Sequence, residues 1–118
     1  MGDGTITGWH AHIYFDAATR ATAARIRAAV AARFPDLWIG RMHDGPVGPH
    51  PMPSCLFVFG PERLGEVVPW LLLNRDGCVI LLHPETGDPL ADHTTHAVWF
   101  GPAQALRLAA LTQESPTQ

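Results

Sequence analysis

The order of strand-like and helix-like segments constrains the fold of this chain most strongly. Residues 6–15 alternate between apolar and polar side chains, which is typical of a half-buried strand. A segment rich in alanine and arginine follows over 17–33 and predicts a helix with Asp16 as its N-cap. Similar patterns predict strands over 37–42, 55–59, 78–82 and 95–100 and helices over 60–74 and 103–112, with a proline-rich loop over 43–53.

This order of segments is βαββαβ followed by one more strand and helix, and it predicts an α+β, ferredoxin-like fold. We expect a single domain over residues 1–118. Two helices would cover one face of an antiparallel sheet and leave the other face for a site or a partner. Because a large exposed apolar face usually marks an interface, we expect a homodimer through that face.

The composition excludes several classes of function. The chain has a net charge of −3 and no lysine, so nothing in it predicts a nucleic-acid partner. Its apolar stretches are too short to predict a membrane span, and the first residues lack the pattern of a secretory signal. Cys55 and Cys78 lie in apolar runs and are expected to be buried thiols. We therefore expect a cytoplasmic protein whose partner is a small molecule.

Five of the seven histidines occupy positions that suggest a common site. His10 and His12 share the polar face of the first strand with Tyr14, whereas the other three are His50, His83 and His93. In the expected strand order 4-1-3-2, His83 at the end of strand four lies near His10. The 43–53 loop can carry His50 back over the sheet towards His12. Neutral imidazole is the commonest protein ligand for transition metals, so this gathering predicts a metal site.

Three motifs also resemble the DOPA 4,5-dioxygenase family. They are His-Ala-His-Ile-Tyr-Phe at 10–15, Gly-Pro-His-Pro at 48–51, and Leu-His-Pro-Glu-Thr-Gly-Asp with the following Asp-His and Trp-Phe-Gly within 82–101. The resemblance covers nearly the whole chain. It implies a dimeric ferredoxin-like protein with a non-haem Fe(II) site made of histidines. The implied activity is extradiol cleavage of a catechol such as L-DOPA, with O2 as the second substrate.

Extradiol cleavage requires a metal with open coordination positions, a base and a proton donor. We expect His12, His50 and His83 to bind Fe(II), although zinc or another divalent ion would also suit these ligands. His93 and His10 are the expected catalytic residues. Asp92 or another carboxylate is expected to fix the tautomer of His93, whose ordinary pKa near 6.5 suits proton transfer. The possible carboxylate ligands are Asp16, Glu85 and Asp92.

Other interpretations of the same residues stay open. His83 before Pro84 could simply end a strand, and Tyr14 could contact substrate or serve structure alone. Arg41 could bind a substrate carboxylate, but a solvated arginine at a strand end is the preferred interpretation. The tryptophans, Trp9, Trp38, Trp70 and Trp99, are expected to be core or dimer contacts. The alternative functions are a non-catalytic metal-binding or small-ligand-binding domain, and a cofactor-free dimer whose histidines serve stability.

Overall fold

The computed structural model describes residues 5–113, and a five-stranded antiparallel sheet forms its centre. The sheet contains β1 (Gly8–Tyr14), β2 (Trp38–Ile39), β3 (Ser54–Phe59), β4 (Ile80–Glu85) and β5 (Val98–Phe100) in the order β2-β3-β1-β4-β5. The helices are α1 (Arg20–Arg33), α2 (Leu64–Asn74), α3 (Pro89–His93) and α4 (Ala109–Gln113), and the 3-10 turn η1 (Pro61–Arg63) precedes α2. The first four strands have the ferredoxin-like order, which confirms the predicted fold, and β5 extends the sheet beside β4.

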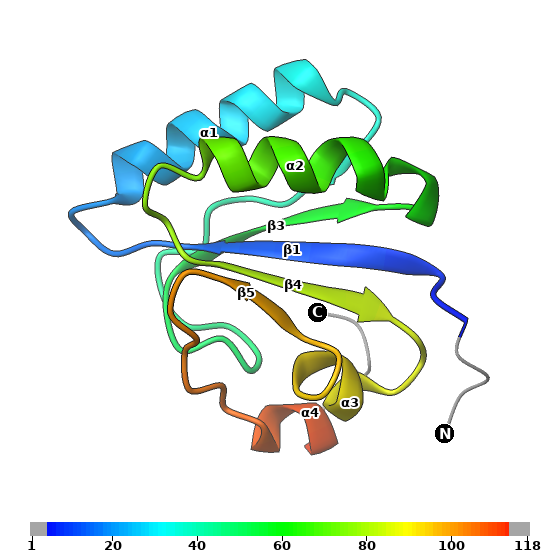
Figure 1. The fold of residues 1–118 in the computed structure, drawn as a ribbon. Coiled ribbons are helices and arrows are strands. Elements are labelled where there is room, and N and C mark those ends of the chain that lie inside the picture. The colour runs from blue at the N-terminus through cyan, green and yellow to red at the C-terminus, as the bar shows by residue number, and fades with distance from the viewer. Residues whose placement is uncertain (1–4, 114–118) are drawn as a thin grey trace.

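The hydrophobic core lies between the sheet and the layer formed by α1 and α2 (Figure 1). The alternation in β1 sends Ala11 and Ile13 into this core, where both are fully buried. Helix α1 contributes Ala23, Ile26 and Val30, whose spacing of three and four residues places them on one side of the helix. Burial of each large aliphatic side chain contributes about 1.5–3 kcal/mol. The core therefore determines which face of β1 is left for polar residues.

Several segment boundaries differ from the sequence-based predictions. The strands predicted over 37–42 and 95–100 are confined to Trp38–Ile39 and Val98–Phe100, and a hydrogen-bonded turn from Thr94 to Ala97 precedes the second of them. Helix α1 begins at Arg20, not at residue 17, because the Asp16 carboxylate accepts hydrogen bonds from the backbone and hydroxyl of Thr19 and holds a turn there. The C-terminal helix is confined to Ala109–Gln113, and residues 103–108 form no helix. Strand β4 continues to Glu85, so His83 lies inside the strand and does not end it. The polar residues at 113–118 predict a frayed tail, and those beyond Gln113 lie outside the described residues.

The face of the sheet opposite α1 and α2 is not bare, which corrects the premise of the expected dimer interface. The 43–53 loop, α3 and α4 lie on this side of the sheet (Figure 1). The loop is held by the Arg107 backbone, whose N–H donates to the Pro49 carbonyl at 2.8 Å. In the part of the chain described, no helix is long and apolar enough to cross a membrane. A homodimer stays a prediction, but its interface is not a bare face of the sheet.

Candidate metal centre

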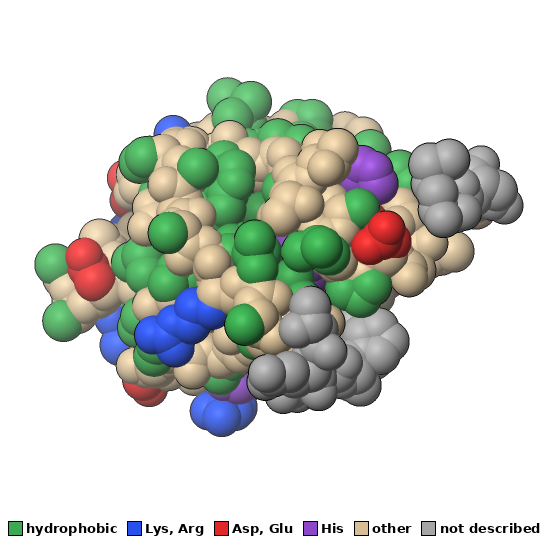
Figure 2. All heavy atoms as spheres, turned by 90° about the horizontal axis from the view of Figure 1, so that it is seen from below, with side chains coloured by type: hydrophobic (Ala, Val, Ile, Leu, Met, Phe, Trp, Pro, Cys, Tyr) green, Lys and Arg blue, Asp and Glu red, His purple; other side chains and the backbone are tan. Residues whose placement is uncertain are grey.

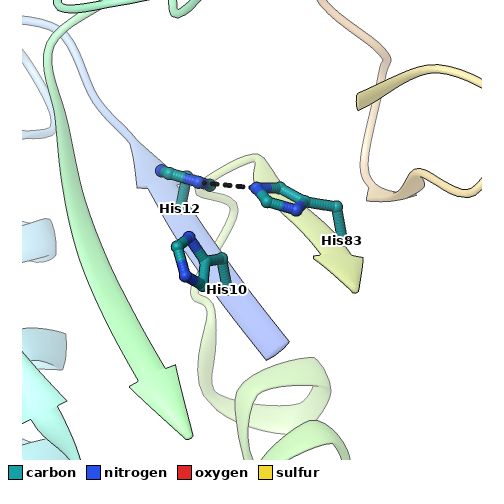
Figure 3. A group of neighbouring side chains, drawn as sticks. All are labelled: His10, His12 and His83. Carbon is teal, nitrogen blue, oxygen red and sulfur yellow. Dashed lines mark hydrogen bonds between the residues drawn. The ribbon is translucent and has the colours of Figure 1, made fainter. Parts of the chain in front are cut away.

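Strands β1 and β4 place three histidines on the face of the sheet that is turned away from the core. The alternation that buries Ala11 puts His10 and His12 on this face. In the antiparallel register, His10 stands opposite His83, and their ring centroids are 5.1 Å apart. The predicted proximity of His83 and His10 is therefore confirmed. Figure 3 shows the rings of His12 and His83 pointing towards each other from the two strands, with His10 beside them.

The 43–53 loop and α3 supply two more histidines. The His50 ring centroid lies 4.0 Å from that of His12, and His50 Nδ1 is 2.7 Å from the Tyr14 hydroxyl. The position predicted for His50, near His12 and Tyr14, is thus confirmed. The His93 ring centroid lies 4.0 Å from that of His83. The five histidines that were predicted to form the site lie close together in one cluster. His43 and His96 lie outside this cluster.

Helix α3 is short, and local chemistry determines where it begins. Pro89 occupies its first position, where a missing N–H costs nothing, and the Asp88 side chain accepts from the Ala91 N–H. His93, the last residue of the helix, is 4 % exposed. The N-cap and the proline thus set the position from which His93 reaches the cluster.

The hydrogen bonds that the Nδ1 atoms form show which imidazole nitrogens are free to bind a ligand. A carbonyl can only accept, so His83 Nδ1 donates to the Pro84 carbonyl at 2.9 Å, and His93 Nδ1 donates to the Pro89 carbonyl at 2.7 Å. In the neutral rings Nε2 then carries the lone pair. The Nε2 atoms of His50 and His93 are buried and have no hydrogen-bond partner. Buried polar atoms without partners are costly, and a bound ligand is one explanation for them.

The distances between nitrogens suit a metal ion. His12 Nε2 and His83 Nε2 are 3.1 Å apart. Two nitrogens that each lie about 2.1 Å from one ion are separated by about 3 Å when their bonds form a right angle. Ligand atoms within 4.8 Å of one another occur in two buried groups, His10 with His12 and His83, and His12 with His50 and His93. His12 belongs to both groups, and the predicted set of His12, His50 and His83 is divided between them.

Burial keeps the clustered imidazoles neutral. It lowers the pKa of His50 to about 3 and that of His83 to about 3, with a further decrease from the neighbouring His93. The pKa of His12 lies well below its ordinary value for the same reason, and burial lowers the pKa of His10 to about 4. Uncharged rings with free lone pairs do not repel a cation, so these residues fit a divalent metal.

The carboxylates contact other residues than the sequence-based predictions expected. Glu85 Oε2 lies 3.5 Å from His83 Nδ1 and 3.8 Å from His10 Nε2, so it is the carboxylate beside the cluster. The expected pairing of Asp92 with His93 is wrong. Asp92 accepts from the Thr86 N–H and hydroxyl and pairs with His96, whereas the Pro89 carbonyl binds His93. The Asp16 carboxylate instead accepts a hydrogen bond from the Thr19 N–H.

The proton affinity of His93 also differs from the expectation. Burial lowers the pKa of His93 below its ordinary value, although the hydrogen bond to the Pro89 carbonyl opposes this. The residue is therefore neutral at pH 7 and is better suited to accept a proton than to donate one. The sequence-based predictions contained no helix here, although Asp88 followed by Pro89 is a signal for the start of a helix.

A cavity of about 360 Å³ opens beside the cluster, and its buried end is formed by His12, His50 and Ser54. Trp38 and Arg41 line its exposed end. Trp38 is 60 % exposed, so it is not a core residue, and its other expected role, a dimer contact, stays a prediction. Trp9 and Trp70 do pack against the core, and Trp99 contacts Tyr14 edge-on at 5.8 Å. Figure 2, which looks onto the side of the sheet opposite α1 and α2, shows histidine atoms at the surface only in small patches.

The fold and the cluster together define a small α+β domain with a buried, histidine-lined centre that could hold a metal ion. The chain belongs to the Dopa 4,5-dioxygenase family, whose model matches residues 9–110. It is 36 % identical over 121 residues to a DOPA 4,5-dioxygenase from Amanita muscaria, an alignment that covers 96 % of this chain and 53 % of that protein. The family resemblance noted in the sequence is thereby confirmed.

Two further proteins are similar to this chain. An uncharacterized 21.2 kDa protein from Botryotinia fuckeliana is 38 % identical over 84 residues, which cover 64 % of this chain and 46 % of that protein. The chain thus spans about half the length of the curated relatives it matches. A crystal structure of a candidate dioxygenase from Nostoc punctiforme shares 50 % identity with a TM-score of 0.88, covering 92 % of this chain and 93 % of that one.

Proposed function

We propose that this protein is an extradiol ring-cleaving dioxygenase that acts on a catechol, such as L-DOPA, with Fe(II) and O2. The observation that carries the proposal is the convergence of buried, neutral imidazoles at the closed end of a cavity large enough for an aromatic ring. Membership of the Dopa 4,5-dioxygenase family supports the same reaction class.

His12, His50 and His83 would hold the metal, and when bound it would supply open coordination positions for the two substrates. His12 and His83 already place their Nε2 atoms 3.1 Å apart. His50 and His83 do not share one 4.8 Å group, so completing the set requires one of these side chains to shift. In the competing set His93 takes the place of His83. Tyr14 positions His50 through the 2.7 Å hydrogen bond to Nδ1.

His93 and His10 would handle the protons of the substrate. Neutral His93, with a buried and unpartnered Nε2, is suited to accept the proton of a catechol hydroxyl. His10 lies 3.8 Å from Glu85, whose pKa is raised by burial and by Asp92. The buried end of the cavity keeps bulk water away from the reacting groups.

The test is turnover by protein loaded with one known metal. Chelator-treated protein is reconstituted anaerobically with Fe(II), and oxygen and L-DOPA or 4-methylcatechol are then added. We expect a yellow ring-opened product and consumption of one O2 per catechol. Protein loaded with Zn(II) is the matched control, which should show no turnover because zinc does no redox chemistry. Iron that binds tightly without any oxygen consumption would favour the alternative, a non-catalytic metal-binding or small-ligand-binding domain.

A further inference from the structure

The edge of the sheet is irregular beside the cavity. Ile39 pairs with Phe57, and the next bridge joins His43 to Ser54. Three residues, 40–42, therefore stand opposite two, 55 and 56. This count defines a β-bulge, a device that changes the direction of side chains and is common next to active sites.

The bulge gives the two residues after Gly40 different environments. Met42 packs against the hydrophobic core, whereas Arg41 is exposed and lines the same cavity as His12 and His50. In a regular strand the residue after Gly40 would point to the core face. The extra residue of the bulge is thus what brings a guanidinium to the cavity.

Among the residues that the structure describes, Arg41 is the one lysine or arginine side chain that lines this cavity, and no carboxylate lines it. Within residues 5–113, the Arg41 side chain forms no salt bridge or hydrogen bond. The nearest acidic neighbour along the chain, Asp44, is already bound by Arg20 at 2.5 Å. Asp44 still feels the charge of Arg41, which helps to lower the pKa of that carboxyl, but the N–H donors of Arg41 are left for an anion from outside the protein.

The position of Arg41 relative to the histidines suits a substituted aromatic ring. His12 lies on β1, Leu56 is its partner on β3, and Gly40 donates its N–H to the Leu56 carbonyl. Two strand spacings, about 10 Å in all, therefore separate the backbone of β1 from the bulge. An aromatic ring with a short side chain fits between the histidines and the guanidinium.

Trp38 supplies an apolar wall at the same end of the cavity. A Cβ atom added at Gly40 would lie 3.2 Å from the Trp38 ring, so the indole lies against the bare backbone of Gly40. An exposed indole at the mouth of a cavity can pack against an aromatic ligand. The cavity thus offers metal-binding imidazoles at the buried end and an indole with a guanidinium at the open end.

We infer that Arg41 determines substrate specificity by binding a carboxylate on the side chain of the catechol. This inference rests on the proposed function, because it assigns the ring hydroxyls to the histidine cluster. Arginine binds a carboxylate through two parallel N–H donors, and lysine cannot reproduce that geometry. Arg41 is exposed and follows the end of β2, as the preferred sequence-based interpretation expected, and our inference adds a binding role to that position.

The test compares two substrates that differ only by the anionic group. Iron-loaded wild type, Arg41→Gln and Arg41→Lys are assayed with 3-(3,4-dihydroxyphenyl)propionate and with 4-ethylcatechol. For Arg41→Gln we expect KM for the carboxylated substrate to rise about 10–100-fold. The kinetics with 4-ethylcatechol should stay within about twofold of wild type, and Arg41→Lys should fall between the two. Arg25→Gln, which changes an exposed helix arginine paired with Asp76, is the matched control.

A second readout separates this inference from the proposed function. Binding of 3-phenylpropionate, which lacks ring hydroxyls, is measured by calorimetry with the metal-loaded protein. Weaker binding to Arg41→Gln than to wild type supports the carboxylate site even if no catechol is turned over, an outcome that would defeat only the proposed function. Equal losses on both substrates, or unchanged KM together with unchanged binding of 3-phenylpropionate, would overturn the role of Arg41.

Discussion

At the scale of single residues, His12 is the side chain on which both possible ligand groups depend. Its Nε2 atom lies 3.1 Å from His83 Nε2, and its ring centroid lies 4.0 Å from that of His50. We predict that His12→Ala abolishes metal retention, because it removes the ligand that the two groups share. Metal per chain is measured by elemental analysis after reconstitution and desalting. His43→Ala, the same change outside the cluster, should keep the metal, and unchanged stoichiometry in His12→Ala would exclude it as a ligand.

Replacing His93 distinguishes a catalytic role of this residue from a role as a metal ligand. We predict that His93→Ala keeps its iron and loses about 10²–10⁴-fold in kcat, the usual contribution of a general base or acid. Iron content and turnover are measured on the same preparation. Loss of iron would instead favour the set of His12, His50 and His93. Retention of both iron and full rate would make His93 structural and move the search for a base to His10 or Tyr14.

At the scale of elements, α2 carries large apolar side chains on its outer surface. Val67 and Leu71 face the core, yet Leu72 and Leu73 on the same helix are 54 % and 81 % exposed. A helix that is apolar on more than one side usually has a second partner. Because the opposite face of the sheet carries the 43–53 loop and α3, α2 is the better place for the dimer contact.

We therefore predict a homodimer that is weakened by charge on α2. Wild type should have the mass of a dimer by light scattering at micromolar concentration, and Leu72→Glu with Leu73→Glu should shift it towards the monomer. Arg33→Glu on α1 is the control for a charge change on the same layer of helices. A monomeric wild type would contradict the dimer, and a dimeric double variant would place its interface elsewhere.

At the scale of the whole molecule, the buried histidines link stability to pH. The pKa values of His10, His50 and His83 are lowered to about 4, 3 and 3, whereas they rise towards 6.5 on unfolding. Below pH 6.5 the unfolded chain binds more protons than the folded one, so the stability of metal-free protein falls as pH decreases. Each such histidine contributes a slope of up to about 1.4 kcal/mol per pH unit.

We expect the free energy of unfolding of chelator-treated protein to be several kcal/mol lower at pH 5 than at pH 7.5. Urea denaturation followed by circular dichroism at a series of pH values measures this difference. Between pH 7.5 and 8.5 these histidines should contribute no change, which provides an internal control. A midpoint that stays constant from pH 7.5 to pH 5 would show that the imidazoles are not held neutral in the folded protein.

Much of the architecture could be predicted from sequence because its signals are local. The alternation of residues in β1 determined that His10 and His12 lie on one face of the strand and Ala11 and Ile13 on the other. An error of one residue would have placed the histidines in the core. The antiparallel order of the strands then placed His83 beside His10. The prolines around His50 correctly indicated a loop, and three motifs correctly indicated the family.

Only the tertiary structure decided what each histidine contacts. The partner of His93 is the Pro89 carbonyl and not Asp92, because a five-residue helix without a periodic signal sets the direction of that ring. The bulge that directs Arg41 to the cavity depends on pairing between residues that are distant along the chain. Periodicity reports which face of a strand a residue occupies. Ring orientation, protonation and access to a cavity depend on neighbours from other segments, and those neighbours are brought together only when the chain folds.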